Sequence, residues 1–136
     1  QAAIGLELLA RRARRAGVIL PYRVNRGEAP LMIDFVPVLA ALADEAENLS
    51  EEERAGRALD FHVTMAAAVA EVLHLLSALT GLRTAVLSGG VFQNALLLEE
   101  LLAYLEDFRV LLPHAAPPND GGIAYGQAAV ALARMG

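Results

Sequence analysis

Apolar residues recur three and four positions apart along most of the chain, which is the spacing of amphipathic helices. The longest such stripe predicts a helix from Glu51 to about Leu79. Ser50 and Glu53 form a capping-box pattern before it, and Thr80-Gly81 ends it. Because the average helix has only about 11 to 12 residues, we expect this helix to be the central packing element. Alanines dominate its middle and permit a close approach by a sheet or another helix.

The same spacing predicts shorter helices. They are expected at residues 2–16, from Pro37 to about residue 47, from residue 91 or 92 to residue 105, and at residues 119–135. Arginines occupy the end of the first of these helices, where cations complement the helix dipole, and Gly17 is the expected end. Asp34 is a candidate cap for the helix that begins near Pro37.

Short apolar, partly β-branched runs between the helices predict strands. Residues 18–24 and 31–35 are typical of a hairpin, with a turn at residues 25–27. Residues 84–88 and 108–112 flank a helix, and such a crossover implies neighbouring parallel strands. The predicted fold is therefore α/β, a single domain over residues 1–136 with a small hairpin beside it. Since the chain does not begin with Met, we expect it to be part of a longer protein.

The stretch TAVLSGGVFQN, residues 84–94, places two glycines between a strand and a helix. Backbone N–H groups at such a corner favour anions, and glycines let a phosphate approach with no Cβ in the way. We therefore predict a phosphate site at Ser88, Gly89 and Gly90. Asn94 is then either a helix cap or a contact to a ribose or a base. A simple turn is the competing interpretation, because two glycines after a strand are common in turns.

A second glycine corner, Asp120-Gly121-Gly122, precedes the last predicted helix. Asp120 has two interpretations that the residues leave open, a turn and cap residue or a ligand of a hard cation. His62 and His74 are more than three turns apart on one helix, so they cannot bind one metal, and we expect them in the core or on the surface. His114 is the histidine that we most expect to face a ligand.

Composition narrows the class of function. The net charge of −5 argues against a dedicated nucleic-acid-binding protein. The sequence has no cysteine, which excludes disulfides, cysteine-ligated zinc and thiol catalysis. No stretch reaches the length of a membrane-spanning helix without polar interruption, and we expect a cytoplasmic protein. Ser88 lacks the preceding glycine of a Gly-x-Ser-x-Gly elbow, which argues against a serine hydrolase.

Two motifs together, SGGVFQN at residues 88–94 and PPNDGGIAYGQ at residues 117–127, resemble the C-terminal end of the HypF family of hydrogenase-maturation carbamoyltransferases. The opening QAAIGLELLA and the stretch ALDFH at residues 58–62 are also similar to that family, so the likeness spans nearly the whole chain. The resemblance implies the second lobe of the actin-like (ribonuclease H-like) ATP-binding fold. Threonylcarbamoyl-adenosine tRNA-modification enzymes and O-carbamoyltransferases share that fold.

The resemblance also implies a function. Such proteins bind ATP-derived carbamoyl-adenylate between two lobes, near a divalent metal (Fe, Zn or Mg). They pass the carbamoyl group to the C-terminal cysteine of a HypE-type partner, and it becomes the cyanide ligand of NiFe-hydrogenase. Carried over to this sequence, the metal ligand is Asp120, and the nucleotide-binding residues are Ser88, Gly89, Gly90, Asn94, Gly121 and Gly122.

The family's paired metal-binding histidines have no counterpart in this sequence. The chain therefore resembles half of a two-lobed site, completed by the remaining domains of a HypF-type protein, and no catalytic residue is assigned. One alternative is a non-catalytic nucleotide-binding or protein-interaction module, with an apolar face that favours a homodimer. A tRNA-modifying relative is a further alternative, which the acidic charge disfavours.

Overall fold

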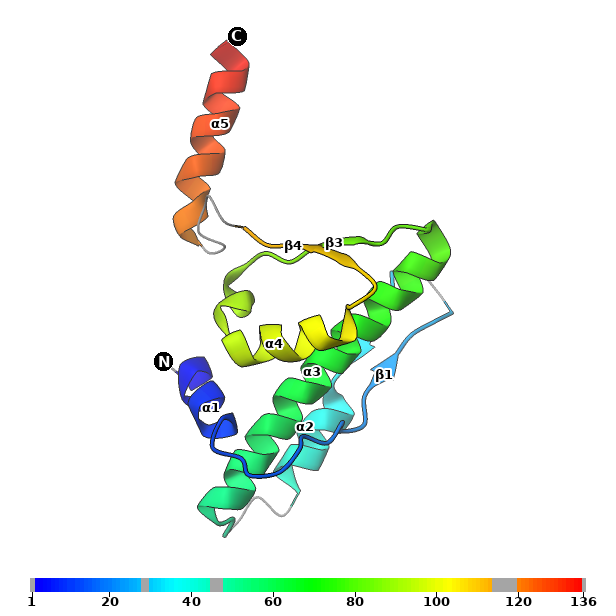
Figure 1. Cartoon of the computed structure of the whole chain (residues 1–136), viewed down its shortest axis with the longest axis vertical. Helices are drawn as coiled ribbons and strands as arrows, with labels where there is room; N and C mark the ends of the chain where they lie inside the picture. The colour runs from blue at the N-terminus through cyan, green and yellow to red at the C-terminus, as the bar shows by residue number, and fades with distance from the viewer. Residues whose placement is uncertain (1, 28–29, 45–47, 114–119, 136) are drawn as a thin grey trace.

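A computed structural model describes residues 2–27, 30–44, 48–113 and 120–135 (Figure 1). Its α-helices and strands, in chain order, are α1 (Ala2–Ala10), β1 (Arg23–Val24), β2 (Ile33–Asp34), α2 (Val36–Ala43), α3 (Glu51–Thr80), β3 (Thr84–Val86), α4 (Ala95–Tyr104), β4 (Arg109–Leu111) and α5 (Ile123–Met135). Two 3-10 helices, η1 (Gly90–Gln93) and η2 (Asp120–Gly122), precede α4 and α5. The α/β class expected from the sequence is confirmed.

Helix α3 is the central element, as predicted, and α1, α2 and α4 all pack on it. The capping box is present at its start: the Ser50 hydroxyl accepts from the Glu53 N–H, and the Glu53 carboxylate accepts from the Ser50 N–H at 2.8 Å. At its end Gly81 adopts a left-handed conformation, φ 75°, which favours glycine. Local capping chemistry therefore sets both ends of the longest helix.

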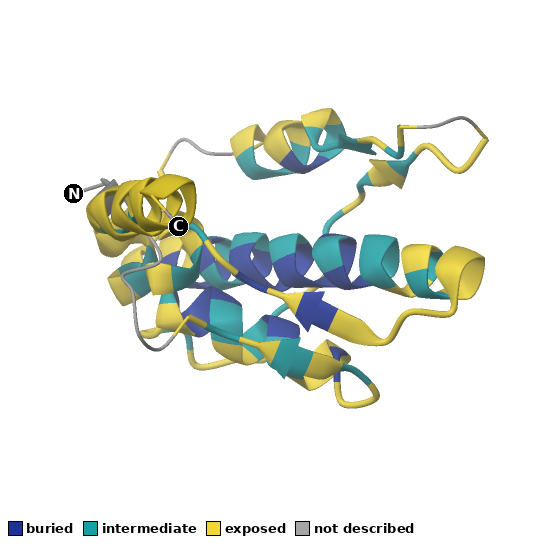
Figure 2. Ribbon diagram, turned by 90° about the horizontal axis from the view of Figure 1, so that it is seen from above, coloured by how far each residue is buried: buried dark blue, intermediate teal, exposed yellow. Residues whose placement is uncertain are grey.

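The main core lies between α3, α4 and a two-stranded parallel sheet (Figure 2). Strands β3 and β4 pair in parallel, with Ala85 opposite Val110, so the predicted strand–helix–strand unit is confirmed, although both strands are shorter than predicted. The buried residues of this core are Ala66, Ala70, Leu87, Leu97, Leu101 and Leu105. Side chains alternate across the strands, so Ala85 is buried while Val86 is 69% exposed on the opposite face.

The first helix is shorter than predicted. It ends at Ala10, not near Ala16, and its last turn holds no basic residue, so Gly17 is not its end. The arginines that follow instead reach carboxylates on other helices: Arg11 contacts Glu99 at 3.3 Å and Arg15 contacts Asp60 at 2.5 Å. Gly17 lies against α3, where a Cβ would come within 2.5 Å of Val63.

The N-terminal hairpin is also shorter than predicted. Only β1 and β2 pair, with Arg23 opposite Asp34, and residues 18–22 form no strand. Side chains of α3 take the backbone donors of this segment, since Val18 N–H donates to Asp60 and Leu20 N–H donates to Thr64. The segment therefore runs along a helix and not along a partner strand.

Helix α2 follows the hairpin and ends at Ala43 within the described residues. Pro37 lies in its first turn, as predicted. Its cap position is Phe35, not Asp34, although the Asp34 carboxylate does accept from the Val36 N–H at 2.9 Å.

Helix α3 is long and apolar enough, by length and composition, to cross a membrane. Core helices of globular proteins share that property. Here α3 buries Asp60, His62 and Thr64 against its neighbours, and each of these side chains has a hydrogen-bond partner.

Helix α5 extends away from the rest of the molecule (Figure 1). Every described residue of this helix is exposed, and its main contact is with η2. The helix predicted at residues 119–135 is confirmed over Ile123–Met135, preceded by η2, and residue 119 lies outside the described residues.

Candidate functional site

The two glycine corners follow the two parallel strands. The first corner, Ser88-Gly89-Gly90, comes after β3, and the chain after β4 leads to the second corner, Asp120-Gly121-Gly122. Carboxyl ends of parallel strands meet at one edge of a sheet, and α/β proteins bind ligands outside that edge. The topology thus directs both corners to the edge where a ligand is expected.

The first corner is an open turn. Gly89 has φ 104°, a conformation that favours glycine, and a Cβ built on it would meet nothing within 4 Å. Ser88 is exposed beside it. The backbone of this turn is therefore accessible to a ligand.

A 3-10 turn separates the first corner from α4. The Phe92 N–H donates to the Gly89 carbonyl at 3.2 Å, and α4 begins only at Ala95 and not at residue 91 or 92. Asn94 is the cap of α4, because its Oδ1 accepts from the Leu97 N–H at 2.9 Å. The capping interpretation of Asn94 is confirmed, and its role toward a nucleotide stays a prediction.

A carboxylate already occupies the N-terminus of α4. The Glu7 side chain, on α1, accepts from the Leu96 N–H at 3.2 Å. A negative group is favourable at a helix N-terminus, and Glu7 fills that role here. Because side chains already occupy the Leu96 and Leu97 N–H groups, the glycine turn is the more favourable place for a phosphate.

His62 lies in the core of this region and is 2% exposed, in agreement with its expected place. Its Nδ1 is 2.7 Å from the Ala58 carbonyl oxygen, and its Nε2 is 2.8 Å from Nδ2 of Asn94. Phe61 meets the imidazole edge to face. His74, by contrast, is exposed near the other end of α3 and contacts the Tyr104 carbonyl.

A cavity of about 360 Å³ opens between α1, α3 and the start of α4, and we call it the Asn94 pocket. Its walls are formed by Ala3, Ile4, Leu6, Glu7, Phe61, His62, Met65, Gly90, Val91, Gln93, Asn94 and Leu97. A mostly apolar wall with a few convergent polar groups is typical of small-molecule sites. Of the predicted nucleotide-binding residues, Gly90 and Asn94 line this pocket, while Ser88 and Gly89 do not.

Sequence reasoning missed Glu7 as a site residue. It lies 89 positions from Leu96, and no local pattern connects the two. Phe61 and His62 did carry a signal, because they belong to the stretch that resembles the HypF family, but the spacing of His62 indicated only a place in the core or on the surface.

The second corner is described in part. Gly121 is exposed and Gly122 is half-buried within η2, and Asp120 is the first residue of η2. The Asp120 side chain and His114 lie outside what the structure describes. Among the described residues no group of three or more His, Asp or Glu side chains is arranged to hold a metal. The metal site stays a prediction.

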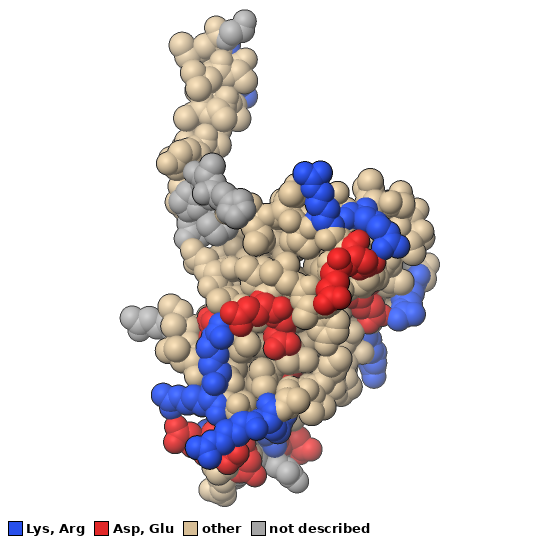
Figure 3. Space-filling model, viewed as in Figure 1, with Lys and Arg blue, Asp and Glu red and all other residues tan. Residues whose placement is uncertain are grey.

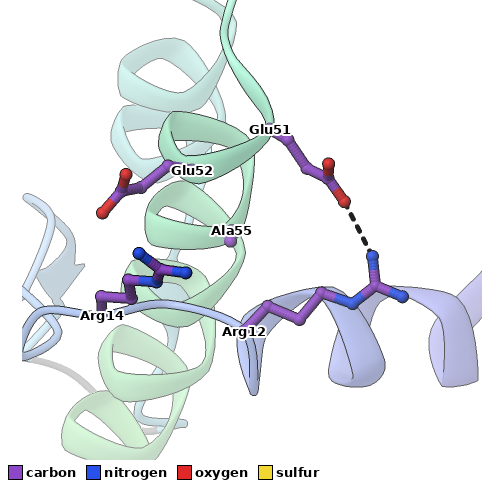
Figure 4. A pocket seen from close by; sticks show the side chains of 5 residues that line it. All are labelled: Arg12, Arg14, Glu51, Glu52 and Ala55. Atoms are coloured by element: carbon purple, nitrogen blue, oxygen red, sulfur yellow. Dashed lines mark hydrogen bonds and ion pairs between the residues drawn. The ribbon is translucent and has the colours of Figure 1, made fainter.

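A second hollow, of about 400 Å³, lies where the segment after α1 meets the start of α3 (Figure 4). Its lining residues are Arg12, Arg14, Glu51, Glu52 and Ala55. Arg12 pairs with Glu51 at 2.8 Å, and Arg14 and Glu52 are drawn near each other. Figure 3 shows the same mixture of signs over this part of the surface. Exposed charges of mixed sign contribute little to stability, and this hollow offers no selective site for a charged ligand.

Residues 1–127 match the family model described as carbamoyltransferase, Kae1-like domain, second subdomain, of HypF proteins. The chain belongs to this family. The match includes the first glycine corner, the Asn94 pocket and the second glycine corner.

Curated relatives agree with this assignment. The carbamoyltransferase HypF2 of Cupriavidus necator is 37% identical over 83% of this chain, and the chain spans 13% of that protein. The carbamoyltransferase HypF of Rhizobium leguminosarum is 35% identical over 96% of this chain, which spans 16% of it. The chain thus corresponds to a small part of the length of these relatives.

Solved structures share the fold. The crystal structure of full-length HypF in its phosphate- and nucleotide-bound form matches with a TM-score of 0.79 at 30% identity, over 96% of this chain and 17% of that one. The structure of HypF from T. kodakarensis matches with a TM-score of 0.75 at 24% identity, over 94% of this chain and 16% of that one, and indicates the fold alone.

Proposed function

We propose that this chain is the C-terminal lobe of a HypF-type carbamoyltransferase with an actin-like fold, and that it forms one wall of a nucleotide site. The observation that carries the proposal is the family match over residues 1–127, which includes both glycine corners. A matching HypF structure in a nucleotide-bound form supports the same assignment.

The ligand of this wall is ATP or a carbamoyl-adenylate derived from it. The open turn at Ser88, Gly89 and Gly90 suits a phosphate, because its backbone is accessible and no Cβ intrudes. The Asn94 pocket suits an uncharged part of the ligand, because the Glu7 carboxylate would repel a phosphate placed against α4. Gly121 and Gly122 border the ligand from the second corner.

The whole protein would transfer the carbamoyl group to the C-terminal cysteine of a HypE-type partner during maturation of NiFe-hydrogenase, in the cytoplasm. An acyl adenylate is open to hydrolysis, so the other lobe is needed to exclude water. Asp120 is the proposed ligand of a divalent cation that would polarise the bound group. Since the described residues offer no cluster for a metal, its other ligands would come from elsewhere.

Calorimetric titration with ATP and with AMP, with and without divalent metal, tests the nucleotide site. Asn94→Ser retains a hydroxyl cap for α4 and removes the amide N–H groups. We expect it to weaken nucleotide binding without unfolding the protein. Asn25→Ser is the matched control, since Asn25 lies in the hairpin turn, where its side chain accepts from the Gly27 N–H. Equal binding by the wild type and Asn94→Ser would contradict the role of Asn94.

A second candidate is a non-catalytic module that self-associates. The specific observation is the exposed apolar surface of α5, where Ile123, Val130 and Leu132 are all more than half exposed. Light scattering of the 136-residue chain distinguishes the two candidates. A dimer that Leu132→Glu dissociates, without nucleotide binding, favours the module, and a nucleotide-binding monomer favours the enzyme lobe.

A further inference from the structure

A continuous line of hydrogen bonds joins α3 to the start of α4. It runs from the Ala58 carbonyl through His62 to the Asn94 side chain and ends at the Leu97 N–H. His62 is 2% exposed, and protein groups supply the partners of both its ring nitrogens. Asn94, at the other end, lines the Asn94 pocket.

The chemistry of these groups determines where the protons lie. A carbonyl oxygen only accepts, so Nδ1 of His62 carries the proton and donates to Ala58. Nε2 is then an acceptor, and it faces Nδ2 of Asn94. The Leu97 N–H faces Oδ1 of the same amide. Both ends of the Asn94 amide are therefore held, and its orientation agrees with every partner.

We infer that His62 is a positioning residue for the nucleotide site, acting through Asn94. It accepts one Asn94 N–H from within the core and so fixes how the rest of the amide is presented to the pocket. This inference rests on the proposed nucleotide-binding function. Because the α4 cap holds only the Oδ1 end, loss of His62 would leave the Nδ2 end without its protein partner.

A double-mutant cycle in the complete gene product tests this role. The variants are His62→Leu, Asn94→Ser and the two combined, and the measurement is ATP affinity by calorimetry together with the midpoint of thermal unfolding. We expect each single variant to lose about tenfold in affinity, the effect of one unsatisfied polar partner. We expect the double variant to bind no worse than Asn94→Ser, because both changes remove the same interaction.

Two further variants separate positioning from general loosening of the core. His62→Gln places a carbonyl oxygen near the position of Nε2, and we expect it to recover affinity to within about threefold of the wild type. Thr64→Val removes a hydroxyl of the same helix that accepts from the Leu20 N–H and donates to the Asp60 carbonyl, without touching Asn94. We expect this control to lower the unfolding midpoint and to leave ATP affinity unchanged.

The outcomes distinguish the inference from the function on which it rests. A wild-type protein that binds no nucleotide overturns the proposed function and this role of His62 with it. Binding that is lost in Asn94→Ser but retained in His62→Leu overturns the inference alone. The same holds if the losses multiply to about a hundredfold in the double variant, or if Thr64→Val weakens ATP binding as much as His62→Leu.

Discussion

Single polar side chains of α3 hold the segment that follows α1. Asp60, Thr64 and Glu71 receive hydrogen bonds from successive positions of residues 15–26, so this segment runs along α3 in the same direction. These acceptors are buried or half-buried. Each hydrogen bond therefore also satisfies a polar side chain inside the protein.

Asp60 is the most critical of these acceptors. Its side chain is 7% exposed and accepts from both terminal nitrogens of Arg15 and from the Val18 N–H. We expect Asp60→Ala to lower the free energy of unfolding by about 1 to 3 kcal/mol, because it removes the buried carboxylate that accepts from Arg15 and from the Val18 N–H. Denaturant unfolding measures this. Asp107→Ala, which removes an exposed ion pair with Arg83, is the control. It should lower the free energy of unfolding by at most about 1 kcal/mol.

Glu71 makes stability depend on pH. The hydrogen bond from Tyr22, followed by that from Arg26, holds the pKa of Glu71 below its ordinary value of 4.5. Burial and the bond to Glu71 raise the pKa of Tyr22 to about 12, so the phenol remains a donor at neutral pH. Since folding lowers the Glu71 pKa, its stabilisation is fully present above the unfolded-state pKa and is lost as pH falls through the folded-state value.

We therefore expect Glu71→Gln to lower the midpoint of thermal unfolding at pH 7. The difference from the wild type should shrink as the pH falls below 4.5, the ordinary pKa of a glutamate. Glu99→Gln, which removes an exposed pair with Arg11, should change the midpoint little at either pH. A difference for Glu71→Gln that is constant across this pH range would argue against the carboxylate as its source.

Among the elements, α3 and α4 form the closest packing of the molecule. Ala66 is fully buried and Ala70 nearly so, and both face the leucines of α4. Small side chains let the two helices approach, as their pattern in the sequence predicted. The floor of the Asn94 pocket depends on the same contact, because Leu97 belongs to both the core and the pocket.

We expect Ala66→Leu to lower the free energy of unfolding by about 1 to 3 kcal/mol, because a larger side chain forces α3 and α4 apart. Ala78→Leu is the matched control on the same helix. Ala78 is exposed, so this substitution should alter the free energy of unfolding by no more than about 0.5 kcal/mol. Equal effects of the two variants in denaturant unfolding would mean that the packing at Ala66 is not tight.

At the scale of the whole molecule, apolar surface is distributed unevenly. One face of the β3–β4 sheet packs on α3 and α4, while Val86 and Leu111 are exposed on the other face. Helix α5 is exposed along its described length (Figure 2). An isolated helix of 13 residues is marginally stable in water, so α5 depends on contacts that the described residues do not supply.

Hydrogen exchange of the 136-residue chain measures how much less stable the exposed helix α5 is than the buried helix α3. We expect the amides of α5 to exchange rapidly and those in the middle of α3 to exchange most slowly, because protection follows buried contacts. Protection of α5 that appears only at high protein concentration would indicate that a second copy covers it. Protection of α5 equal to that of α3 in the monomer would contradict the exposed position of this helix.

How much the sequence predicts differs from one element to the next. The ends of α3 and the cap of α4 follow from Ser50, Gly81 and Asn94, because capping is chemistry between residues three or four positions apart. The parallel strands follow from a strand–helix–strand pattern of suitable length. These features depend on local periodicity, and the printed sequence determines them.

Tertiary contacts alone decided the surroundings of α1 and the formation of the Asn94 pocket. Helix α1 ends at Ala10, and the arginines after it reach carboxylates on α3 and α4. The Asn94 pocket exists because Glu7 reaches the N-terminus of α4 and His62 reaches Asn94. These pairs join residues 32 to 89 positions apart, and neither spacing nor propensity encodes a contact over such a separation. Only the packing of α1 and α4 on α3 brings them together.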